Sequence, residues 1–166
     1  STGNFTYVLM LELTDGTSTI NEKNKYIIVK PTVYQPAFSL SESGFKLPFT
    51  ITEGVTEYIY ELPVTLNTAL TEDITCDVTV KKELLDEYNA TSPIEYSLIS
   101  DKGNNYTIGK LTFSKGNVTA NLTVKIDITN LEGNFALPLE ITSTKYAFSG
   151  ENTVIIGLQN SAPKIT

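Results

Sequence analysis

Residues 118–128 read Val-Thr-Ala-Asn-Leu-Thr-Val-Lys-Ile-Asp-Ile, and apolar and polar side chains alternate along the whole stretch. Every second residue from Val118 to Ile128 is apolar, and the residues between them are Thr, Asn, Lys or Asp. A period of two is typical of a strand with one face buried and the other in water. The stretch therefore predicts a half-buried strand of an antiparallel sheet.

The same alternation recurs in residues 6–14 and 57–66, and turn-forming pairs such as Ser43-Gly44 and Ser149-Gly150 separate the apolar runs. Short strands separated by turns are typical of a sandwich. We predict an all-β fold, an immunoglobulin- or fibronectin-III-like antiparallel β-sandwich. One short helical turn, residues 83–89, should cross from one sheet to the other. The residues expected in the core share the inward phase of their strands: Cys76, Val78, Leu111, Phe113, Leu122, Val124, Ile126, Leu137, Leu139, Ile141 and Ile156.

Composition supports a globular chain and excludes several partners. Of the 166 residues, 40% are hydrophobic and 19% charged, which is typical of a folded domain. The net charge is −7 and all twelve basic residues are Lys, so we expect no nucleic-acid partner. No apolar run is long enough to span a membrane, so we expect no direct membrane span.

An internal repeat bears on domain organisation. Residues 7–29 align without a gap to residues 135–157. Either both segments belong to one pseudo-symmetric fold, or residues 1–31 are the closing hairpin of a preceding copy of the domain. We favour the preceding copy, because the offset is about one domain length. We therefore divide the chain into this hairpin (or accessory strands), a sandwich over 32–160 and a linker over 161–166.

The residues that most enzymes need are scarce. The chain has no His and a single Cys, which excludes Ser-His and Cys-His pairs and argues against zinc or copper sites. Cys76 is interpreted as a small buried hydrophobe rather than a reactive thiol. Residues 101–105 form the best loop for calcium, but a solvated turn is favoured. Glu57 and Glu61 lie on the polar face of one strand, where solvation explains them. We predict no enzyme activity, no catalytic residue, no metal site and no cofactor.

Tyrosine is the remaining candidate for ligand binding. The chain has nine Tyr and no Trp, and sugar-binding proteins stack sugar rings on aromatic side chains. Tyr58 and Tyr60 share the phase of an apolar strand face, so core packing is expected for them. Tyr34, Tyr106 and Tyr146 sit near turns and could form an exposed platform for a polysaccharide or host glycan, although scattered exposed Tyr is common.

Several motifs occur in a fixed order. Asp-Glu-Tyr-Asn at 86–89 follows a Leu, a Gly turn at 116 precedes an alternating strand, and Leu137-Pro138 lies in the strand near the end. Over roughly residues 45–158 this order resembles a Bacteroidetes surface-lipoprotein domain of unknown function. That domain is found N-terminal in family 18 glycoside-hydrolase-like proteins and in candidate cell adhesion proteins.

The resemblance implies an immunoglobulin-like sandwich on the extracellular face of the outer membrane or in the periplasm, held by an upstream lipid anchor that this chain does not contain. It carries no catalytic residues. Three functions stay open: a non-catalytic spacer or adhesion module of a glycan-utilisation or adhesion protein, a carbohydrate-binding domain, and an assembly element that pairs strands with another chain. Neighbouring domains of the same polypeptide are expected partners in the first case.

Overall fold

A computed structural model describes residues 7–10, 26–29, 35–50, 52–99, 106–129, 131 and 133–159. The chain divides into two compact units, Ser1–Gln35 and Pro36–Thr166. In the first unit, β1 (Tyr7–Met10) pairs antiparallel with β2 (Tyr26–Val29). That this hairpin comes from a preceding repeat stays a prediction. The expected linker and the candidate calcium loop lie outside the described residues.

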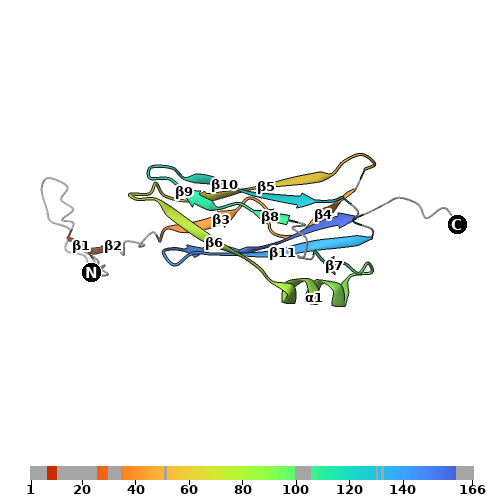
Figure 1. The fold of residues 1–166 in the computed structure, drawn as a ribbon. Helices are drawn as coiled ribbons and strands as arrows, with labels where there is room; N and C mark the ends of the chain where they lie inside the picture. Colours follow the sequence, from red (N-terminus) through yellow and green to blue (C-terminus); the bar gives the residue numbers. More distant parts are fainter. Residues whose placement is uncertain are drawn as a thin grey trace, which may run out of the picture. The chain divides into compact units, whose positions relative to one another are not determined.

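The second unit is a sandwich of two sheets (Figure 1). In the five-stranded sheet, the stretch that first indicated the fold forms β10, which pairs antiparallel with β5 from Thr119↔Thr65 to Asp127↔Glu57. Its strands, in spatial order, are β12 (Ala147–Phe148), β3 (Ala37–Leu40), β5 (Glu57–Leu66), β10 (Thr119–Asp127) and β8 (Tyr106–Ile108).

The six-stranded sheet packs against the first one. Its strands, in spatial order, are β4 (Gly44–Thr50), β13 (Thr153–Gln159), β11 (Asn134–Thr142), β6 (Ile74–Val80) and β9 (Leu111–Phe113), with β7 (Ser97–Leu98) paired to β11 beside this path. Three pairs are parallel rather than antiparallel, namely β4 with β13, β3 with β12 and β7 with β11. Each joins segments far apart in sequence, which alternation within a strand cannot indicate.

The predicted all-β sandwich is confirmed, and so is most of the predicted core. Ten of the eleven expected residues are buried, and Val78 is partly buried against the same cluster. Val78 lies in the part of β6 that continues past the pairing with β9, which ends at the Cys76↔Leu111 pair. Burying each Leu, Ile, Val or Phe side chain contributes about 1.5–3 kcal/mol, so this shared core dominates the stability of the unit.

The helix differs from the prediction. Helix α1 (Lys82–Thr91) has ten residues and joins β6 to β7, two strands of the same sheet, so it does not cross between the sheets. It lies on the outer face of the six-stranded sheet (Figure 1). There Leu85 packs with Tyr96, Ala136 and Ile155 in a second apolar cluster. Among the described residues, no helix is long and apolar enough to cross a membrane.

The path of the chain places the beginning and the end of the sandwich at opposite ends. β3 begins at Ala37, whose carbonyl accepts the N–H of Asn67, just past the last residue of β5. β13 ends at Gln159, opposite Thr50, the last residue of β4. The connection from β4 leads to the start of β5, so Ala37 and Gln159 are separated by about the length of that ten-residue strand, roughly 33 Å. Figure 1 shows the same arrangement, with the start of β3 near one end of the sandwich and the end of β13 at the other.

Candidate functional site

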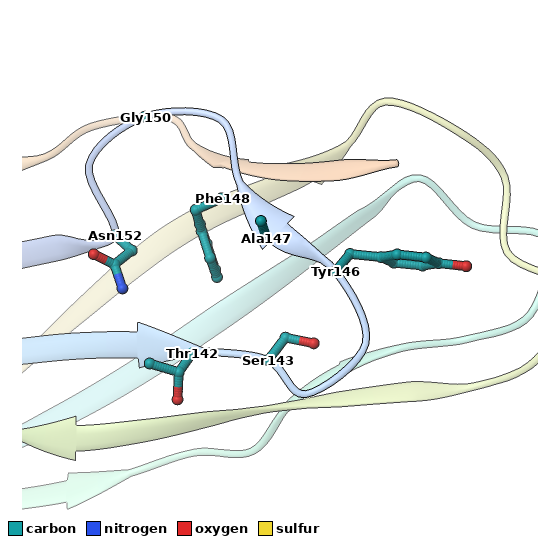
Figure 2. Close-up of a pocket in the computed structure, with 7 residues that line it drawn as sticks. All are labelled: Thr142, Ser143, Tyr146, Ala147, Phe148, Gly150 and Asn152. Carbon is teal, nitrogen blue, oxygen red and sulfur yellow. The ribbon is translucent and has the colours of Figure 1, made fainter. Parts of the chain in front are cut away.

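The connection from β11 to β13 folds back on itself and borders an open pocket of about 310 Å³. This volume is at the lower end of the range of about 300–1,000 Å³ typical of small-molecule sites. Figure 2 shows the residues that line it, which are Thr142, Ser143, Tyr146, Ala147, Phe148, Gly150 and Asn152. We call this set the β11–β13 pocket.

Hydrogen bonds fix the base of this connection. The Ile141 N–H donates to the Asn152 carbonyl (2.8 Å), and Nδ2 of Asn152 donates to the Ile141 carbonyl (2.9 Å). Ser149 N–H donates to the Phe38 carbonyl (2.8 Å), which ties the far side of the loop to β3. The two ends of the connection are therefore held at a fixed spacing, and the pocket between them is preformed.

The tip of the connection is held to the neighbouring loop. Lys145 forms an ion pair with Glu72, which belongs to the connection between β5 and β6. The backbone N–H of Lys145 also donates to Oγ of Ser143 (3.2 Å). Both charged groups are well exposed, so the ion pair contributes at most about 1 kcal/mol. Its main consequence is that the cation beside the pocket already has an anionic partner.

Two aromatic rings connect the pocket to the core. Phe38 is fully buried, and the rings of Tyr146 and Phe148 lie 6.1 Å and 5.4 Å from its ring, centroid to centroid. In Figure 2 the Phe148 ring points from β12 toward the space between Asn152 and Thr142, and the Tyr146 ring extends away from them along the loop. Both rings are partly exposed, so the pocket presents apolar surface that the core holds in place.

The structure does not bring the predicted tyrosines together. Tyr106 is on β8 and pairs with Ile126, so it faces inward and packs against the core. Tyr146 precedes β12, the opposite edge strand of the same sheet. Strands in a sheet are about 4.8 Å apart, which separates these edges by nearly 20 Å. Tyr34 lies outside the described residues. Ligand binding by these three residues stays a prediction, and of the two described here only Tyr146 lines the β11–β13 pocket.

Sequence reasoning did not select the polar residues of the pocket. Thr142, Ser143 and Asn152 carry common side chains in a region of the sequence that already predicted a turn. Their proximity depends on the pairing of β11 with β13, because Glu140↔Thr153 is the last pair before the connection begins. The Ser149-Gly150 turn signal gave the position of the connection, but no sequence signal indicated that it would border a pocket.

A second polar cluster joins the connection between β3 and β4 to β4 itself and to β5 of the other sheet. The Tyr60 hydroxyl donates to Oε1 of Glu42 (2.5 Å), and Nζ of Lys46 lies 2.8 Å from Oε2 of the same carboxylate. The hydrogen bond from Lys46, and then the one from Tyr60, hold the pKa of Glu42 below its ordinary value. Burial, reinforced by the hydrogen bond to Glu42, raises the pKa of Tyr60. We call these three residues the edge latch.

Cys76 lies in the core as predicted and is 3% exposed. Burial raises the pKa of its thiol to about 11, although a hydrogen bond with Ser143 opposes the shift. The thiol is therefore protonated at neutral pH, which disfavours nucleophilic chemistry. Cys76 also borders a second open pocket, of about 320 Å³, between β6 and the link from β8 to β9.

The charged candidates give no further site. Glu57 and Glu61 are exposed on the outer face of β5, as the solvation interpretation expected. In the part of the chain that the structure describes, no group of three or more Cys, Asp or Glu side chains is placed to hold a metal ion.

Three solved structures from Bacteroides show the same fold. A candidate carbohydrate binding protein of Bacteroides ovatus ATCC 8483 is 19% identical, with a TM-score of 0.59, and the match covers 76% of this chain and 37% of that protein. A two-domain protein of unknown function from Bacteroides fragilis NCTC 9343 is 12% identical, with a TM-score of 0.60 and coverages of 76% and 46%. EndoBT-3987 of Bacteroides thetaiotamicron, solved with Man5GlcNAc product, is 16% identical, with a TM-score of 0.53 and coverages of 75% and 30%.

The chain thus spans less than half the length of each of these proteins. No curated protein sequence matches it. A family model that describes an N-terminal domain matches residues 22–147, well over half of the chain. The resemblance to a Bacteroidetes domain of unknown function is confirmed, and the chain belongs to this family of N-terminal domains.

Proposed function

We propose that the chain is a non-catalytic surface module that serves as a rigid spacer in a larger bacterial protein of glycan utilisation or adhesion. The family consists of N-terminal domains, and the fold recurs as a minor part of three solved proteins. One of these is a candidate carbohydrate binder and another was solved with a glycan product. A part shared by proteins with different descriptions is suited to a general role such as spacing.

The observation that carries the proposal is the direction of the chain through the sandwich. β3 begins and β13 ends at opposite ends of the unit, roughly 33 Å apart by the length of β5. A domain with adjacent ends inserts into a protein without lengthening it, whereas one with opposite ends extends the polypeptide. This arrangement supports the spacer role.

The packing also suits a spacer, because a spacer must resist bending. The core between the sheets is continuous from Phe38 to Leu158, and the α1 cluster supports the outer face of the six-stranded sheet. The edge latch joins the connection between β3 and β4 to β5 of the other sheet. We place the module on the extracellular face of the outer membrane or in the periplasm, downstream of a lipid anchor, where such a spacer would hold a partner domain away from the membrane.

The hairpin of the first unit favours a second role, in assembly. The β1–β2 pair repeats the antiparallel pairing of β11 with β13, and Tyr7 and Phe135 are aligned in the repeat. In the sandwich, β11 and β13 also pair with β6 and β4. An isolated two-stranded hairpin is marginally stable, so β1 and β2 need comparable partners, either in a preceding copy or in another chain.

The spacer role is tested by replacement in the full-length protein. Replacing residues 36–159 with an unrelated β-sandwich whose chain ends are equally far apart should preserve glycan use or adhesion, whereas deleting these residues should impair it. If the replacement fails as badly as the deletion, the module has a specific role and the spacer proposal is wrong. The assembly role is tested by measuring the mass in solution with and without residues 1–31, and a monomer in both cases contradicts pairing with another chain.

A further inference from the structure

We infer that the β11–β13 pocket binds one neutral sugar ring. The inference concerns a different surface from the spacer geometry and does not depend on it. It rests on the volume of the pocket, the chemistry of its lining and the rigidity of its walls.

The volume limits the ligand to a single small ring. The pocket holds about 310 Å³ and is open to solvent. Small-molecule sites begin at about 300 Å³, so a single ring fits and a bulky cofactor does not. The opening allows the ring to be part of a longer chain that continues into solvent.

The lining is suited to a ring with an apolar face and a hydroxyl-bearing rim. Phe148 provides aromatic surface on which the C–H face of a sugar can stack, and Tyr146, whose ring extends away along the loop, lies at the border of the pocket. The Thr142 hydroxyl can both donate and accept hydrogen bonds, whereas the Ser143 hydroxyl already bonds to the Lys145 N–H and to Cys76. Such a mixture of apolar walls with a few polar groups is typical of small-molecule sites.

Asn152 adds an oriented amide. Its Nδ2 donates to the Ile141 carbonyl at 2.9 Å, which fixes the orientation of the carboxamide. Among the described residues the Oδ1 of Asn152 has no hydrogen-bond donor, so it can accept a bond from a ligand hydroxyl. A group that is already oriented loses little conformational freedom on binding, which favours affinity.

The charges around the pocket favour a neutral ligand. Among the described residues, no Lys, Asp or Glu lines it, and the adjacent Lys145 is paired with Glu72. A phosphate or carboxylate would therefore find no free cation among the lining residues, and burying an unpaired charge is costly. A neutral polyhydroxylated ring satisfies both the polar and the apolar groups of the lining.

The test is a titration of the isotopically labelled chain with methyl glycosides of glucose, galactose, mannose and N-acetylglucosamine, followed by amide chemical shifts. We expect saturable shifts that concentrate in residues 141–152 for at least one glycoside, with a dissociation constant of about 1 mM. Glucuronate is the charged probe and should bind more weakly than glucose. Absence of saturable shifts up to about 50 mM for every glycoside would overturn the inference, as would stronger binding of glucuronate.

Two variants and one matched control locate the site. Asn152→Ala removes the oriented amide from the lining and should weaken binding about tenfold. Tyr146→Ala removes a ring at the border of the pocket and should weaken binding about threefold. Tyr106→Ala removes the same side chain from a partly buried position on the opposite edge of the sheet and should leave binding unchanged. Melting temperatures establish that each variant is folded. Binding that is unchanged in folded Asn152→Ala, or that is lost in folded Tyr106→Ala alone, refutes the assignment.

Discussion

Replacing Tyr60 by Phe removes one hydroxyl from the edge latch and leaves the ring in place. Tyr60 is 7% exposed, and its hydroxyl donates to the Glu42 carboxylate at 2.5 Å. A hydrogen bond to a charged group contributes about 1.5–3 kcal/mol. Glu42 has a side chain that is 35% exposed and still has Lys46 as a partner, so water and the ammonium group offset part of the loss. We therefore expect Tyr60→Phe to lower the free energy of unfolding by about 1 kcal/mol.

The assay is urea denaturation of the wild type, Tyr60→Phe, Glu42→Gln and the double variant at pH 7. The double-mutant cycle isolates the interaction between the two side chains, and we expect a coupling of about 1 kcal/mol. Tyr58→Phe is the matched control, because Tyr58 is a partly buried neighbour whose ring stacks on Phe49 at 4.1 Å. Its hydroxyl makes no hydrogen bond among the described residues, so its loss should change stability by less than about 0.5 kcal/mol.

The latch should also respond to acid. The pKa of Glu42 is lowered in the folded state, so its contribution is present above its unfolded pKa of about 4.3. It is lost as the pH falls from there through the folded pKa. The difference in stability between the wild type and Glu42→Gln should therefore shrink below pH of about 4.3. A difference that stays constant into strong acid, or a cycle with no coupling at pH 7, would refute the ionic latch.

Three further predictions concern stability and reactivity. A Cβ at Gly109 would lie 3.0 Å from a backbone oxygen of β10, so Gly109→Ala should destabilise the fold by about 1–3 kcal/mol. In the same denaturation assay Gly150→Ala is the control and should be nearly neutral, because a Cβ there meets no atom within 4 Å. The Asn89 side-chain amide donates to the Tyr96 carbonyl and accepts from the Tyr96 N–H, so Asn89→Ala should lower the free energy of unfolding by about 1–3 kcal/mol. A change near zero would show that these bonds do not hold the segment after α1. The Cys76 thiol is buried and its pKa is raised to about 11. At neutral pH it should be alkylated at least about 100-fold more slowly in the native chain than in urea, and rapid labelling of the native chain would contradict its burial.

The sequence predicts strands best where one face of the strand meets water. β10 is such a strand, and its alternation correctly placed Leu122, Val124 and Ile126 inside. The outer faces of β11 and β13 do not meet water, because α1 and the segment after it cover them. Ala136 and Ile155 are therefore buried on the side that alternation alone assigns to solvent. The continuous apolar run in β13 is the sequence feature that indicates burial on both faces, since strands that are buried on both faces lose their alternation.

The pocket and the latch could not be predicted, because each joins residues through tertiary structure. Lys145 and Glu72 come from loops more than seventy residues apart, and the proximity of Phe148 to Phe38 requires the parallel pairing of β12 with β3. The Asp-Glu-Tyr-Asn motif, which in the sequence served only to identify the family resemblance, has a structural role. Its Tyr88 stacks on Phe45 with ring centroids 4.1 Å apart, beside the Asn89 bonds to the next segment.

The repeat differs between its two copies in register, and this difference bears on what the N-terminal hairpin can join. Tyr7 pairs with Val29, whereas the aligned Phe135 pairs with Leu158, one residue beyond the position equivalent to Val29. A shift of one residue exchanges the faces that one strand presents relative to the other. In the sandwich this is tolerated, because β11 and β13 are buried on both faces. Similarity of sequence therefore extends to the antiparallel pairing but not to the register, so a partner that pairs as β6 or β4 does in the sandwich would meet a hairpin of different register.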